Sequence, residues 1–307
     1  YSLSYAGPSE RFLSLLRAAR RRGHRVMAKL QYATTHELAT VPNLPLLHHL
    51  YTKLRTCEQA GLAGMVATWN FGNAFSLNTA LVRRMASHPE RGEPAEFVRR
   101  LAAEVFPACD SRGVSAAVAR FEQAMEHYPF DMPLLYHGPM NYAPVVPLTL
   151  DPLEGTFPGW SCVPGERGDD LSATEKQFAA ERIADAFDAL SAGWAEGVEL
   201  YRAALASCRH ERAARELGVA IAAGACFRST AHVYRTYLLR RDQPAGAADR
   251  FAAIVSDEIE NLRRLVPHLE ADERLGFHAE CQEQMFDAAG VRRKLEALER
   301  LSEAAGG

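Results

Sequence analysis

The chain has 307 residues, of which 48% are apolar and 24% charged, and its formal net charge is −3. This composition is typical of a globular protein that can bury a sizeable core, in two structural units rather than one. The small, mixed charge gives no electrostatic footprint for nucleic acid or an anionic membrane surface. No apolar run reaches the roughly 18 residues that a membrane helix needs.

The cysteines are dispersed along the chain, and none stands in a CxxC motif or at metal-binding spacing from a histidine. Neither a zinc site nor a disulfide framework is therefore indicated, and we expect no cofactor. The sequence begins at Tyr1, in what reads as the middle of a structural element. We therefore expect a C-terminal portion of a longer protein, with cytoplasmic and secreted locations both open.

Residues 1–90 alternate strand-like and helix-like segments. Ser9 is the predicted N-cap of a helix that ends at Gly23. Residues 24–32 then read as a strand, residues 46–61 as an amphipathic helix, and residues 62–68 as a second strand. This order is typical of parallel βα units, and both strands read as apolar runs covered on both faces. We therefore predict an α/β unit formed by the last two or three βα units of a (β/α)8 barrel, whose other strands lie upstream or in a second chain.

Residues 91–307 are predicted to form a helical-bundle domain. Helices are expected at 93–106, 115–127, 211–240, 246–266 and 278–301, and another is expected to begin with a capping box at Ser172. Within that helix one buried face is predicted, because apolar residues recur every three or four positions: Ile183, Phe187, Leu190, Trp194, Val198 and Tyr201. The Pro-rich segment 128–172 reads as a packed loop, of a length that often carries function.

Catalytic groups of a parallel barrel lie where its strands end, and polar or aromatic residues follow both predicted strands. Glu37 lies after the first strand, in the stretch KLQYATTHELATVP, and Trp69 and Asn70 lie after the second. Glu37 is a candidate nucleophile or water-activating base of a glycosidase, which also needs a second carboxylic acid. The alternative is a carboxylate that supports its own loop. Trp69 is a candidate platform for a sugar ring or else a core residue, and Asn70 could bond to a sugar hydroxyl.

Four more residues are candidates for a substrate-binding site. Tyr5 and His36 lie in predicted strand-end loops, and His36 is not part of an HExxH zinc motif because position 40 is threonine. Lys29 lies within the first strand, where it would need a charged partner inside a barrel. It could instead form a Schiff base in a lyase or aldolase. His137, in the stretch YHGPMNY, belongs either to a lid over the site or to a packing loop.

The order KLQ, THE, a Pro-bounded loop, a strand and TWNFGN resembles the last two strands of retaining glycoside hydrolase barrels. The resemblance implies that Glu37 is the nucleophile of the seventh strand and Trp69 the tryptophan of the eighth. The acid/base of the fourth strand would lie outside this chain. The helical part, with its stretches YHGP and DERLGF, is similar to the domain that follows the barrel in α-glucuronidase-like carbohydrate-active enzymes.

Two hypotheses about function follow. In the first, the full-length protein is a glycoside hydrolase that acts on a carbohydrate substrate, and the present chain is inactive by itself. In the second, the chain is a non-catalytic helical interaction or scaffolding protein. Sugars that raise the melting temperature would favour the first, and a protein partner of residues 90–307 would favour the second.

Overall fold

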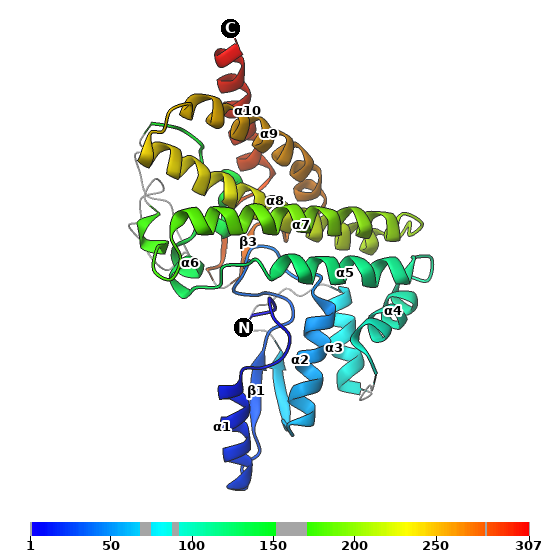
Figure 1. Ribbon diagram of the computed structural model, residues 1–307. Helices are drawn as coiled ribbons and strands as arrows, with labels where there is room; N and C mark the ends of the chain where they lie inside the picture. Colours follow the sequence, from blue (N-terminus) through cyan, green and yellow to red (C-terminus); the bar gives the residue numbers. More distant parts are fainter. Residues whose placement is uncertain (1, 68–74, 88–91, 152–170, 280, 307) are drawn as a thin grey trace.

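The computed structural model describes residues 2–67, 75–87, 92–151, 171–279 and 281–306, and these residues form mainly α-helices (Figure 1). The α-helices are α1 (Glu10–Arg21), α2 (Leu47–Gln59), α3 (Leu77–Ser87), α4 (Pro94–Val105), α5 (Ser111–Met125), α6 (Met132–His137), α7 (Ala180–Leu205), α8 (Glu211–Asp242), α9 (Ala247–Ala271) and α10 (Ala288–Gly306). The strands are β1 (Met27–Leu30), β2 (Gly64–Ala67), β3 (Phe277–His278) and β4 (Glu283–Gln284). Short 3-10 helices are η1 (Pro139–Asn141), η2 (Ala143–Val145) and η3 (Ser172–Thr174).

The predicted partial (β/α)8 barrel is wrong. β1 and β2 pair in parallel, with Met27 opposite Gly64, and no other described residue joins this sheet. The remaining strands form one small antiparallel hairpin, so the described chain is mainly all-α. The apolar runs were expected to be covered on both faces, but Met27 is 63% and Val66 53% exposed. A strand–helix–strand pattern fits one crossover as well as a barrel, because a local pattern does not fix the number of strands.

Helix ends follow the predicted signals only in part. Ser9 caps α1, since its Oγ accepts a hydrogen bond from Phe12 N at 3.2 Å. The capping box at Ser172 is wrong, because that residue begins η3 and α7 starts later, at Ala180. The N–H of Ala180 instead donates to Glu175 Oε2 at 3.1 Å. The last predicted helix also begins later than expected, because the β3–β4 hairpin occupies its first residues.

The helical core is centred on α7, which packs between α5 and α8 (Figure 1). The predicted buried face of α7 is confirmed, since all six of its apolar residues are buried. Trp194 lies at its middle, where the indole Nε1 donates to Ala220 O at 2.8 Å and the ring stands 4.5 Å from that of Phe121. Gly197 lets α5 approach, because a Cβ there would be 2.5 Å from Phe121 Cδ1.

The carboxyl end of β1 meets this helical core. In Figure 1, α1 and β1 extend away from the helix layers, and the chain after β1 returns toward them. Two contacts fix that return: Tyr128 Oη donates to Glu37 O at 2.9 Å, and Asn141 Oδ1 accepts from Ala39 N at 2.8 Å. Within the part of the chain that the structure describes, no helix is both long and apolar enough to cross a membrane.

Candidate functional site

The segment after β1, residues 31–43, is polar and yet almost entirely buried; we call it the Glu37 loop. Its polar side chains with at most 6% exposure are Gln31, Thr34, Thr35, Glu37, Thr40 and Asn43. The loop is closed at both ends by Asn78 of α3, whose Nδ2 donates to Tyr32 O at 2.8 Å and to Leu44 O at 3.0 Å. Asn43 adopts a left-handed conformation (φ 63°), which asparagine tolerates better than most residues. Asn78 and Asn43 thus allow a tight loop whose polar side chains are buried.

Glu37 is fully buried, and its two carboxylate oxygens have different surroundings. Oε1 accepts hydrogen bonds from Leu3 N at 3.0 Å, from Ser4 N at 2.8 Å and from Ser2 Oγ. Oε2 is buried and has no hydrogen-bond partner among the described residues. Buried polar atoms are usually paired, and an exception calls for an explanation, such as a role in binding or catalysis. One oxygen is therefore anchored by the N-terminal segment, while the other is buried without a partner among the described residues.

Other unpaired polar atoms lie within the Glu37 loop and on the asparagines that bind its backbone. Within the described residues, the buried side-chain atoms that lack a hydrogen-bond partner include Gln31 Oε1 and Nε2, Thr35 Oγ1, Thr40 Oγ1, Asn43 Oδ1, Asn78 Oδ1 and Asn141 Nδ2. They come from the loop itself, from α3 and from η1. The set contains hydroxyl groups, amide donors and amide acceptors. A ligand rich in hydroxyl groups can satisfy all three kinds, because each hydroxyl both donates and accepts.

Lys53 of α2 supplies a positive charge beside Glu37. It is 6% exposed, its Nζ donates to Ser2 O, and that nitrogen stands 5.4 Å from the centre of the Tyr5 ring. Burial lowers the pKa of Lys53, and the charge of Glu37 opposes this shift. Tyr5 itself is 49% exposed and therefore lies at the edge of the cluster. Sequence reasoning missed Lys53, although its place on the apolar face of a predicted helix was a usable signal.

The structure also describes three more of the predicted site residues. His36 is half-buried, its ring centre is 6.5 Å from that of Tyr136, and burial is the main cause that lowers its pKa. His137 is half-buried at the end of α6, next to Tyr136. Lys29 is exposed on β1 and not enclosed in a barrel. A Schiff-base lysine needs a desolvated amine or a cationic neighbour, so the exposure of Lys29 weighs against that role.

Trp69 and Asn70 lie outside the described residues. Their expected roles, a platform for a sugar ring and a hydroxyl ligand, therefore stay predictions.

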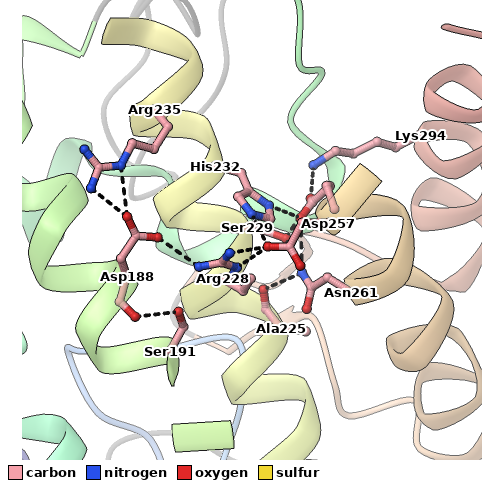
Figure 2. A network of polar contacts seen from close by, with 11 residues as sticks. Asp188, Ser191, Ala225, Arg228, Ser229, His232, Arg235, Asp257, Asn261 and Lys294 are labelled. Atoms are coloured by element: carbon pink, nitrogen blue, oxygen red, sulfur yellow. Dashed lines mark hydrogen bonds and ion pairs between the residues drawn. The ribbon is translucent and has the colours of Figure 1, made fainter. Parts of the chain in front are cut away.

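A second polar cluster joins α7, α8, α9 and α10 (Figure 2). At its centre is Glu258, which is fully buried and accepts from Ser229 Oγ at 2.8 Å, His232 Nδ1 at 2.8 Å and Asn261 Nδ2 at 3.1 Å, and also from Lys294 Nζ. Both carboxylate oxygens of Glu258 are thus paired with protein groups. This cluster fastens helices together, and it differs from the Glu37 loop, where several buried acceptors and donors have no partner among the described residues.

Comparisons with protein-family models, with curated proteins and with solved structures find no match to this chain. The chemistry of the Glu37 loop therefore has to follow from its own residues.

Proposed function

We propose that the Glu37 loop is the substrate site of a carbohydrate-active hydrolase, in which Glu37 acts on a glycosidic bond as nucleophile or base. The observation that carries the proposal is the asymmetry of the Glu37 carboxylate. Oε1 is held by three donors of residues 2–4, and Oε2 is buried without a partner among the described residues.

The asymmetry suits both roles of a glycosidase carboxylate. A nucleophile has to approach the anomeric carbon along a fixed direction, and a base has to hold one water in place. Hydrogen bonds to Oε1 fix the carboxylate plane, so that Oε2 keeps one orientation. Side chains locked in this way are what a working site requires.

The neighbouring groups favour a sugar over an apolar substrate. Amide and hydroxyl groups of Gln31, Thr35 and Asn43 lie within the same loop, with atoms that no described residue pairs. A buried site with unpaired polar groups discriminates against ligands that lack matching hydroxyl or amide groups, because each unmatched group costs about 1–3 kcal/mol. A polyhydroxylated substrate satisfies such a site.

Glycosidic hydrolysis also needs a carboxylic acid across the bond from Glu37. Glu122 of α5 does not fit that role, since Oε1 accepts from His49 N at 2.8 Å and Oε2 pairs with His48 Nδ1 at 2.9 Å. The acid role is therefore not assigned to any described residue. The proposal concerns Glu37 and the subsite around it.

Glu37→Gln tests the proposal, and Glu216→Gln is the matched control. Glu216 is also a buried glutamate, but both of its oxygens have partners, Leu77 N at 2.7 Å and Tyr201 Oη at 3.4 Å. Hydrolysis of a panel of aryl glycosides and calorimetric binding of oligosaccharides are measured for the full-length protein, which is the parent, and for both variants made in it. We expect Glu37→Gln to lose turnover on the order of 10³-fold or more while the control keeps it.

Two results would contradict the proposal. One is a Glu37→Gln variant that binds and hydrolyses the panel as the parent does. The other is a parent protein for which no member of the panel gives either binding heat or turnover.

A further inference from the structure

Two cysteines far apart in the sequence lie together at one end of the helical core. Cys109 directly precedes α5, and Cys208 follows the end of α7. The backbone joins the two places, because Asp110 N donates to Ala204 O at 2.9 Å. Close packing continues one turn further on, where a Cβ at Gly113 would be 2.9 Å from Ala204 Cβ. In Figure 1 the start of α5 accordingly lies beneath the end of α7.

The thiol groups of Cys109 and Cys208 interact across this contact. Burial raises the pKa of Cys109 to about 11, and the nearby Cys208 contributes to the shift. The pKa of Cys208 is also raised, chiefly by burial, and its thiol interacts with that of Cys109. Burial raises the pKa of the Tyr201 phenol, and the nearby thiols of Cys109 and Cys208 add to that shift. The sulfur of Cys109 also lies near the end of α4, since its thiol donates to Ala102 O at 3.6 Å.

These thiols are also more accessible to solvent than two other described cysteines. Cys109 and Cys208 are both half-buried, whereas Cys57 and Cys226 are buried. A small oxidant can therefore reach the pair, while burial protects the two inner thiols. Sequence spacing gave no sign of this pair, since 98 residues separate its members in the chain.

We propose that Cys109 and Cys208 form a reversible disulfide that fastens α5 to α7 when the protein meets a small-molecule disulfide oxidant. The cross-link does not depend on the proposed function of the Glu37 loop.

The reaction is thiol–disulfide exchange in two steps. Cys208 loses its proton, and its thiolate attacks one sulfur of the oxidant; the S–S bond of the oxidant breaks and one thiol leaves. Cys109 then loses its proton and attacks the Cys208 sulfur of the mixed disulfide, which expels the second thiol. The two cysteines give up two electrons and two protons in all, and the oxidant takes them up as two thiols. Cys208 acts first because the pKa of Cys109 is strongly raised.

The bond would close a long loop of chain that includes α5, α6 and α7. Closing a long loop restricts the unfolded chain more than the folded one, which stabilises the fold. For a protein of this size we expect the melting temperature to rise on the order of 5 °C on oxidation.

Treatment of the whole protein with oxidised glutathione tests the proposal. We expect peptide mapping by mass spectrometry to show residues 109 and 208 in one linked peptide, two hydrogen masses lighter than its reduced parts. Thiol titration in denaturant should fall by two. The melting temperature should rise, and dithiothreitol should reverse all three changes.

Cys208→Ser should lose the linked peptide and the rise in melting temperature. Cys281→Ser is the matched control, because that cysteine is also half-buried but lies in the β3–β4 turn, and it should keep both. Absence of the 109–208 peptide in the parent, or an unchanged melting temperature when the peptide is present, would overturn the proposal.

Discussion

Replacing Lys294 with methionine removes the cation that faces the buried carboxylate of Glu258. Lys294 lies on α10 and Glu258 on α9, so their ion pair crosses a helix interface. Their side chains are 3% and 0% exposed, and water therefore cannot replace the lost partner easily. Methionine has a similar length and no charge, so the substitution keeps most of the packing and removes the ion pair together with the hydrogen bond from Lys294 Nζ to Ala143 O at 3.1 Å.

The size of the effect follows from the pKa of Glu258. Burial alone would raise it, but the charge of Lys294 and the hydrogen bond from His232 prevail and lower it from 4.5 to about 2. One pKa unit corresponds to about 1.4 kcal/mol, so the partners of ionised Glu258 stabilise the fold by about 3 kcal/mol. Since the pKa is lower in the folded state, this contribution is complete above pH 4.5 and is lost as the pH falls through 2.

Removing one partner of a buried ion pair typically costs about 3–5 kcal/mol. We expect Lys294→Met to lower the free energy of unfolding by about 3 kcal/mol at pH 7 and by clearly less near pH 3, because His232 still pairs with Glu258. Urea denaturation followed by circular dichroism measures both values. Arg292→Met is the matched control, because it breaks a pair with Glu270 across the same two helices whose side chains are each 48% exposed. We expect it to cost less than about 1 kcal/mol. Equal losses in the two variants, or a loss in Lys294→Met that does not shrink in acid, would refute the reasoning.

Three further substitutions test the helical core and a buried acid. Gly197→Ala should destabilise the protein by about 1–3 kcal/mol, whereas Gly218→Ala in α8, where the nearest atom is 3.4 Å from the added Cβ, should stabilise it by about 0.5–1 kcal/mol. Thermal denaturation distinguishes them, and similar shifts would contradict the packing argument. Burial raises the pKa of Glu216 from 4.5 to about 7, so the folded protein binds this proton more tightly than the unfolded chain does. The resulting contribution to stability is complete below pH 4.5 and is lost as the pH rises through 7. Glu216→Gln should therefore be more stabilising at pH 8 than at pH 5, and a pH-independent difference from the parent in urea denaturation would argue against it.

The helices of the second half could be predicted because their signal is local. The apolar face of α7 follows from spacings of three and four residues, and such a face is buried whatever helix it meets. The sheet could not be predicted in the same way. β1 and β2 each read as a strand, but the number of strands beside them depends on contacts that no single segment encodes. The prediction that these two strands belong to part of a barrel was therefore wrong.

In the candidate site, too, local features could be predicted and contacts between distant segments could not. The position of Glu37 after a strand was visible in the sequence, and its helix-cap role could be set aside because α2 begins well beyond it. The groups that hold its carboxylate could not be foreseen, since the N–H donors of Leu3 and Ser4 lie more than thirty positions away. Asn141, which binds the same loop through Ala39, lies 102 positions from that residue.

The contacts made by Tyr128 and Asn141 also restrict how this chain can evolve by recombination. Both residues belong to the mainly helical part, and both bind the backbone of the Glu37 loop. A recombination event that joined residues 1–90 to a different helical partner would leave a buried backbone carbonyl and a buried N–H unmatched. The Glu37 loop and the helical part that binds it must therefore be inherited together. The predicted boundary between residues 1–90 and 91–307 is not a place where this protein can be divided.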